Sequence, residues 1–228
     1  MADLTYNDLQ GISHADIRAL KARNFVANNG KDTSLLGKIK IAPVQLRSLV
    51  YWLSATAVSD KQFFDNTVNG IITKNYTGTK TYPNDFANEN VEITHAKIIP
   101  DVAFAVLISS GTALDAYHYF CAATYLKWNV DNVMVFECGL EYLMPHMPVG
   151  NGAGTQSLDS VIDNTYVKLP EPIRIAPGAK LTVDVKVATG MTTAADAAAT
   201  NAHIPVISTS VGVFSLQLLC LGTTVSVA

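Results

Sequence analysis

Alternation of apolar and polar residues runs through the chain from about residue 71 onward, and this period of two restricts the fold more than any other feature. In 181–187 the apolar residues share one face and the polar residues share the other, as in a strand with one solvated face. Further candidate strands are 71–75, 91–98, 102–109, 117–125, 133–141, 166–169, 173–175, 204–209 and 211–221. Turns rather than helices separate these segments, which predicts a mainly β protein with an antiparallel sandwich or barrel.

The N-terminal part of the chain is predicted to be helical. Ser13 followed by Asp16 resembles a capping box with Asp in place of Glu or Gln, and Asn28-Asn29-Gly30 supplies a stop. A second helix is expected from Pro43, because apolar residues then recur at helical spacing. These residues are Leu46, Leu49, Val50 and Leu53. Residues 38–41 alternate and allow a short strand between the helices. We therefore expect a helical N-terminal arm, residues 1–58, and a β domain, residues 71–228.

Basic residues are concentrated in the predicted arm. Residues 1–50 hold seven basic and four acidic side chains, whereas the rest of the chain holds nine basic and fifteen acidic ones. A mildly basic arm on an acidic body predicts contact with nucleic acid, a lipid headgroup or the acidic body of a neighbouring subunit. The solvated face of an ordinary helix accounts for the same residues without a partner. The candidate contact residues are Arg18, Lys21, Arg23, Lys31, Lys38, Lys40 and Arg47.

No catalytic or metal-binding motif accompanies the strands. The five histidines are scattered, and none shows the His-x-His spacing of a cupin-type metal site. Glu137 and Glu141 share a strand face, but four residues of extended chain span about 13 Å, which exceeds the carboxylate separation of about 5 to 9.5 Å in glycosidases. The glycine-rich segment 150–154 lacks the Lys-Ser/Thr of a P-loop. We therefore expect a protein that is not an enzyme and binds neither cofactor nor metal.

Three further features of the sequence concern the cellular compartment of the protein. Residues 1–10 contain no apolar core, so no signal peptide is expected. The uncharged run 204–221 is long enough to cross a bilayer, but Pro205, Gly212 and many β-branched residues favour an interior strand. The three cysteines are far apart and lie in apolar stretches, which is typical of buried thiols.

Charged residues are unusually scarce. They make up 15% of the chain, whereas soluble domains carry about 25%. Interfaces between permanently associated subunits are depleted in Lys, Glu and Asp. The composition therefore predicts a homo-oligomer with many copies, because symmetric repetition of such contacts gives closed assemblies.

The segment Leu169–Val185 combines a short strand, a Pro177-Gly178 turn and a cleanly alternating second strand. It resembles the late-barrel hairpin of viral jelly-roll coat proteins, and of bacteriophage structural proteins in particular. The resemblance implies a jelly-roll-like fold for residues 71–228 and a capsid subunit that self-assembles into a shell. It also implies a place in the virion after synthesis in the host cytoplasm, with other virion proteins as partners. For residues 1–58 it implies an arm inside the shell, in weak contact with the genome or an internal membrane.

A second hypothesis is a carbohydrate- or receptor-binding β-sandwich module on a virion or cell surface. Four aromatic residues would then form a stacking platform, although aromatic residues in strands more often belong to a core. These residues are Tyr117, Tyr119, Tyr125 and Trp128. A small hydrolase without a recognisable motif is a third hypothesis.

Overall fold

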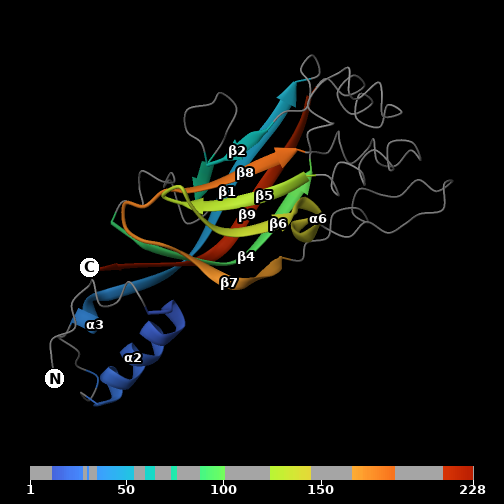
Figure 1. Ribbon diagram of the computed structural model, residues 1–228. Coiled ribbons are helices and arrows are strands. Elements are labelled where there is room, and N and C mark those ends of the chain that lie inside the picture. The colour runs from blue at the N-terminus through green and yellow to red at the C-terminus, as the bar shows by residue number, and fades with distance from the viewer. Residues whose placement is uncertain are drawn as a thin grey trace, which may run out of the picture.

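Two antiparallel β-sheets form the body of the protein in a computed structural model (Figure 1). The structure describes residues 12–27, 30, 35–53, 60–64, 73–75, 88–100, 124–144, 166–187 and 213–227. The five-stranded sheet has the order β3 (Thr73–Asn75), β1 (Ile39–Leu53), β9 (Val213–Val227), β4 (Asn90–Pro100), β7 (Val167–Ile175). The four-stranded sheet has the order β2 (Lys61–Phe63), β8 (Leu181–Val187), β5 (Thr124–Val130), β6 (Val133–Gly139). The prediction of a mainly β, antiparallel protein is therefore confirmed.

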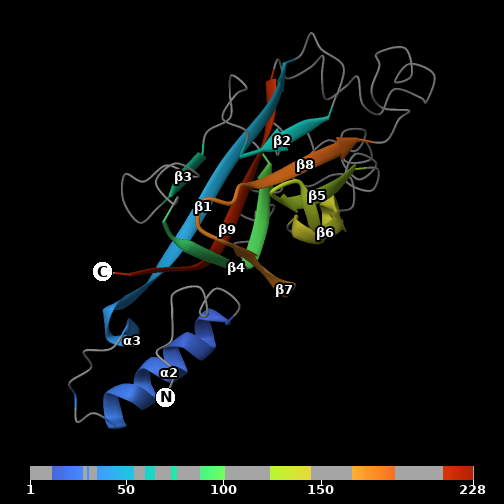
Figure 2. The same cartoon turned by 60° about the vertical axis from the view of Figure 1, so that its left-hand side comes forward.

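The strands pair in a nested order. The long strand β1 pairs with β9, from Ile39 opposite Val227 to Leu53 opposite Val213. Inward along the chain, β2 pairs with β8, β4 with β7, and β5 with β6, all antiparallel. The pairs β9–β4 and β8–β5 then join these ladders into the two sheets (Figure 2). The described chain is therefore wound like a long hairpin that has been rolled up, with β3 added at one edge.

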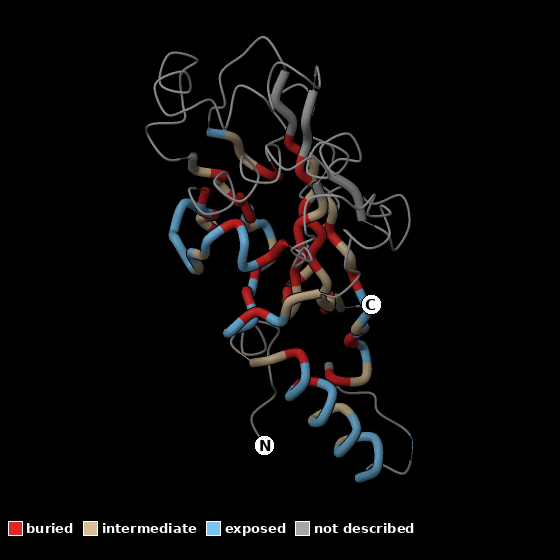
Figure 3. Tube along the Cα trace, turned by 90° about the vertical axis from the view of Figure 1, so that its right-hand side faces the viewer, coloured by how far each residue is buried: buried red, intermediate tan, exposed pale blue. Residues whose placement is uncertain are grey.

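The core lies between the two sheets. Leu46 and Leu218 point into it from the five-stranded sheet, and Trp128 and Val183 point into it from the four-stranded sheet. All four side chains are fully buried. Alternate residues of each strand face this layer, as in packed sheets about 10 Å apart. Figure 3 shows the buried positions gathered along the inner strands of the body.

Two turns between strands have well-defined geometry. Asp131 and Asn132 have φ of 50° and 66°, which is the conformation of the type I′ turn that suits a two-residue hairpin. The carboxylate of Asp131 accepts a hydrogen bond of 2.8 Å from the Lys180 amide, which ties this hairpin to the start of β8. At Pro177-Gly178, φ of Gly178 is 79° and the Ala179 amide donates to the Ala176 carbonyl at 3.0 Å.

The Pro-Gly turn is thus confirmed, but the hairpin predicted around it is wrong. The strands on its two sides, β7 and β8, lie in different sheets and do not pair with each other. The turn carries the chain from one layer of the sandwich to the other.

The helix predicted from Pro43 is also wrong, because residues 39–53 form strand β1 of the five-stranded sheet. Val44, Leu46 and Val50 point into the core at a spacing of two, and the residue between the last two inward positions is the buried Ser48. Its hydroxyl accepts a hydrogen bond of 2.9 Å from the Phe64 amide. A polar residue at an inward position hid the period of two, so the remaining apolar residues matched helical spacing.

Most of the other predicted strands within the described residues are present. β3, β4 and β8 coincide with the predicted strands 71–75, 91–98 and 181–187 to within two residues. The predicted pair 166–169 and 173–175 is the single strand β7, and 133–141 ends in the short helix α6 (Leu140–Leu143). β2 and most of β5 were not predicted. The predicted strands 102–109 and 204–209 lie outside the described residues.

The C-terminal apolar run ends in strand β9. Within the described part of the chain, no helix combines the length and the apolar character that a membrane crossing requires.

Candidate functional site

Helix α2 (His14–Ala27) begins and ends where the sequence predicted. The Ser13 hydroxyl accepts a hydrogen bond of 3.1 Å from the Asp16 amide and donates one of 2.6 Å to the Asp16 carboxylate. This exchange satisfies one of the unpaired amides at the helix N-terminus. After Ala27, Gly30 adopts φ of 82° and its amide donates to the Phe25 carbonyl at 2.9 Å.

The first half of α2 packs on the outer face of the five-stranded sheet. Ile17 is fully buried against Ile39 of β1 and Val225 of β9, and Leu36 of the short helix α3 (Leu35–Lys38) closes the cluster. The second half of α2 has no such cover, since Phe25 is 54% exposed and Val26 is 76% exposed. In Figure 3 the helix below the body is coloured mostly as exposed. α2 is therefore packed against the sheet in its N-terminal half, whereas its C-terminal half, the bare half, is exposed to solvent.

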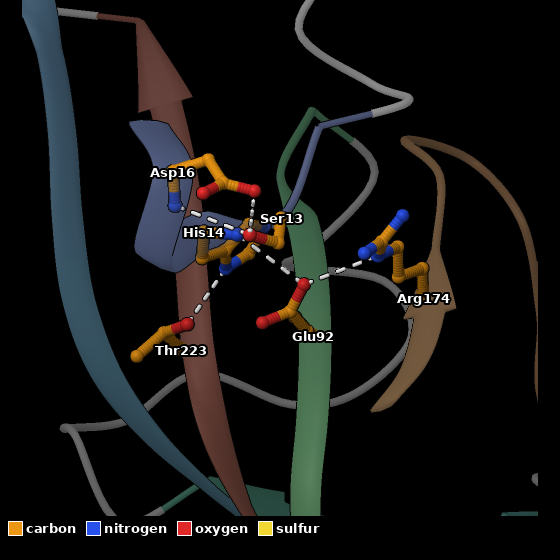
Figure 4. Close-up of polar contacts among 6 residues, drawn as sticks. All are labelled: Ser13, His14, Asp16, Glu92, Arg174 and Thr223. Carbon is orange, nitrogen blue, oxygen red and sulfur yellow. Dashed lines mark hydrogen bonds and ion pairs between the residues drawn. The ribbon is translucent and has the colours of Figure 1, made fainter. Parts of the chain in front are cut away.

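A buried carboxylate holds the attached end of α2. The Glu92 carboxylate on β4 accepts a hydrogen bond of 3.3 Å from the His14 amide and one of 3.2 Å from the Arg174 guanidinium on β7 (Figure 4). The Glu92 side chain is 6% exposed. Unpaired amides and the helix dipole make a helix N-terminus favourable for an anion. The charge of Glu92 is therefore compensated from two sides, and it fixes where α2 begins.

The imidazole of His14 completes the contact. It is 2% exposed, and its Nδ1 lies 2.6 Å from the hydroxyl of Thr223 on β9 (Figure 4). Burial lowers the pKa of His14 below its usual 6.5, while the nearby Glu92 opposes this shift and Arg174 adds to it. The docked helix therefore favours a neutral His14 ring.

A glycine lets the strands approach closely beneath this contact. A Cβ at Gly222 of β9 would lie 1.9 Å from the carbonyl oxygen of Glu92, so no larger residue fits there without movement of the backbone. The register of β4 shifts between Ile93 and His95, just beyond this point. Gly222 thus allows the close approach of β4 and β9 that positions Glu92 and Thr223 next to the helix.

The seven basic residues predicted as arm contacts have different surroundings. Arg18 and Arg23 on α2, Lys38 at the end of α3 and Lys40 at the start of β1 are exposed. The Lys21 ammonium donates a hydrogen bond to the Ile39 carbonyl, and so helps to hold α2 to β1. Arg47 is half-buried in β1 next to Gln217 of β9. Lys31 lies outside the described residues. Contact of these residues with genome, lipid or a neighbour stays a prediction.

Sequence reasoning missed the residues that seat the helix. His14 was one of five scattered histidines, and Glu92, Arg174 and Thr223 were ordinary polar positions of strands. Glu92 lies opposite Arg174 in one ladder and opposite Thr223 in the other. Only the pairing of β7, β4 and β9 brings these three together, and the sequence carries no signal for that order. The described residues contain no group of three or more His, Cys, Asp or Glu side chains arranged to hold a metal ion.

The predicted aromatic platform is wrong in one member. Trp128 is fully buried in the core and is not available for stacking on a ligand. Tyr125 is 37% exposed, with the Lys127 ammonium 5.4 Å from its ring centroid. Tyr117 and Tyr119 lie outside the described residues.

No protein-family model, no curated protein and no solved structure matched this chain.

Proposed function

We propose that the protein is a structural subunit of a bacteriophage virion, a capsid protein with a jelly-roll fold that self-assembles in many copies without catalysis. The nested strand pairing carries this proposal. A jelly roll is a double-sheet fold of eight strands that occurs in viral capsids, and its strands are wound from a folded hairpin. The pairs β1–β9, β2–β8, β4–β7 and β5–β6 follow that winding, with β3 as an addition.

Exposed apolar residues support a role in assembly. Edge strand β6 presents Val133, Met134 and Val135 with exposed fractions of 65%, 55% and 48%. An exposed apolar edge strand invites association with other chains, and natural monomers usually protect such edges. Together with the low charge content of the chain, this surface favours a subunit whose flanks are covered by its copies.

The N-terminal helix supports the idea of a tethering arm. Its first half is fixed to the body through Ile17 and Glu92, so its direction is set before any partner arrives. Its second half carries Arg23, Phe25 and Val26 into solvent. We propose that this half joins subunits, and that the exposed basic residues provide a weak contact with genome or an internal membrane.

Assembly of the purified protein tests the proposal. Light scattering coupled to size-exclusion chromatography, followed by negative-stain electron microscopy, is expected to show large particles of regular size. A monomer that stays monomeric at high concentration would contradict the capsid function. A small oligomer that binds a glycan array would instead favour the recognition module.

A further inference from the structure

We propose that the exposed side of α2 in one subunit docks on the outer face of β6 and α6 in a second copy of the chain. This inference rests on the proposed function, since it names the contact through which neighbouring subunits join. It combines two exposed surfaces that lie on different parts of the molecule and match in apolar character, charge and spacing.

The donor surface is a stripe along α2. Arg18, Ala22, Phe25 and Val26 follow the spacing i, i+4, i+7 and i+8, which places them on one side of a helix. All four are exposed, and the buried Ile17 lies on another side. We call these four residues the α2 stripe. It has a positive charge at its first residue and two large apolar side chains at its end.

The acceptor surface lies on β6 and α6. Phe136 and Cys138 of β6 pack against the core, so Glu137 points to the outer face of the sheet. The register shifts after Phe136, so that Met134 pairs with Asn129 and Val133 pairs with the core-facing Val130. Asn129 donates to the Asp184 carboxylate on the outer face, and Met134 therefore lies on that face too, with Val135 unpaired at the bulge. The Cγ of Glu141 lies 3.7 Å from the position of a Cβ on Gly139, which places the Glu141 side chain over this same face. We call Met134, Val135, Glu137 and Glu141 the β6 row. It has two exposed apolar residues at one end and two exposed carboxylates at the other.

The two surfaces match when their directions are opposed. From Arg18 to Phe25 and Val26 the helix rises by about 11 Å. The distance along β6 from the centre of Met134 and Val135 to a point midway between Glu137 and Gly139 is about 12 Å. One antiparallel placement therefore sets Phe25 and Val26 on Met134 and Val135 and Arg18 beside the carboxylates. The apolar contact provides affinity, whereas the exposed ion pairs fix orientation and register.

The geometry points to a second copy as the occupant. Within one subunit, α2 lies against the outer face of the five-stranded sheet, whereas β6 is an edge of the four-stranded sheet (Figure 1). The stripe and the row of one molecule therefore do not meet. A contact that uses different surfaces on the two partners is heterologous, and it leaves each subunit with one free stripe and one free row. Such a contact continues from subunit to subunit, and it closes into a ring where its rotation allows closure and gives an open chain where it does not.

Charge reversal tests the register. Arg18→Glu and Glu141→Arg are each expected to weaken self-association at least tenfold in sedimentation velocity at low salt, because each places like charges together. The double variant R18E/E141R restores opposite charges and is expected to recover most of the association. Glu171→Arg, at an exposed position on β7, is the matched control and should associate like the unmodified protein. Circular dichroism checks that each variant is folded. Association unchanged in both single variants, or no recovery in the double variant, would overturn the inference.

Crosslinking tests the contact without requiring particles. Phe25→Cys and Val135→Cys are prepared separately, mixed, and treated with a short bismaleimide, and a covalent dimer of the two variants is expected. Burial raises the pKa of Cys138 to about 12 and raises that of the fully buried Cys220, so these thiols give little background. Mixing Phe25→Cys with Glu171→Cys is the control and should give no more dimer than Phe25→Cys alone.

The two experiments separate the two proposals. Particles without the crosslink and without an effect of charge reversal would retain the capsid function and refute the docking contact. The crosslink in a protein that forms only short chains or a small ring would retain the contact and refute the shell.

Discussion

The outer faces of the two sheets differ in how far the chain covers them. On the five-stranded sheet the chain covers its own strands with α2, and the contact is closed by Glu92, Arg174, His14 and Thr223. On the four-stranded sheet the edge strand β6 presents Met134 and Val135 to solvent, next to the exposed Glu137 and Glu141. The first face needs a fixed geometry, because a buried carboxylate is stable only with its partners in place. The second face needs only a complementary surface, which suits a contact that forms after folding.

The largest expected effect comes from a substitution in the five-stranded sheet, beneath the face that α2 covers. Gly222→Ala should lower the free energy of unfolding by about 3 kcal/mol, because its Cβ overlaps the Glu92 carbonyl and forces β4 and β9 apart. Urea denaturation measures the loss. Gly139→Ala is the matched control, since a Cβ there meets only Glu141 Cγ at an ordinary 3.7 Å. Equal stability of the two variants would show that the close approach does not matter.

Removal of the buried carboxylate should release the helix. Glu92→Ala takes an acceptor from the His14 amide and from Arg174, and we expect a loss of about 2 kcal/mol. Hydrogen exchange should show faster exchange of the amides of α2 while the inner strands stay protected. Glu171→Ala, at an exposed position on the neighbouring strand β7, should leave both quantities unchanged. Full protection of α2 in Glu92→Ala would contradict the role given to this residue.

Lower pH should weaken the docking of α2 on the sheet, by less than Glu92→Ala does. The pKa of His14 is lowered in the docked state, chiefly by burial, with Arg174 and Arg18 adding to the effect and Glu92 and Asn90 opposing it. Above the usual pKa of 6.5 the ring is neutral whether the helix is docked or released. As the pH falls below that value, only the released form takes up a proton, so docking loses free energy. The protection factors of the α2 amides, which are corrected for the intrinsic pH dependence of exchange, should fall between about pH 7.5 and about pH 5.5.

A variant at this histidine sharpens the pH test. His14→Gln removes the titrating group and should flatten the pH dependence of the protection factors in α2, whatever its effect at neutral pH. A slope as steep as that of the unmodified protein would assign the dependence to another group.

The smallest effect on stability is expected at the bare face. Val135→Lys replaces a side chain that is 48% exposed, so the free energy of unfolding should change by no more than about 0.5 kcal/mol. Its effect on association should nevertheless be large, because a lysine blocks an apolar edge. Urea denaturation and light scattering on the same sample measure the two quantities. A large loss of stability would show that β6 belongs to the core rather than to an interface.

The sequence predicted those parts of the fold in which local pattern and tertiary environment agree. β8 has one buried and one wetter face, and its alternation was visible directly. The cap of α2 depends only on Ser13 and Asp16, which are neighbours in the chain. β1 was mistaken for a helix because the inward Ser48 takes part in a hydrogen bond with the Phe64 amide, a partner that its own sequence does not reveal.

The candidate site was less predictable for a related reason. The basic residues of α2 are visible in the sequence, but what holds the helix is an acidic residue about eighty positions away. Glu92 looks like any outward polar residue until β9 lies beside β4. The β6 row contains Glu137 and Glu141, which sequence analysis had considered as a catalytic pair. Their exposure and their place beside Met134 and Val135 point to a surface contact.

The pairing of β1 with β9 has a consequence for synthesis. β9 lies between β1 and β4, so the middle of the five-stranded sheet stays open until residues 213–227 have left the ribosome. Ladders between such distant segments form late and slowly, and they leave strand edges exposed in the meantime. A product truncated before this strand cannot complete the sheet that supports α2, because Val225 and Thr223 of β9 are part of the helix contact.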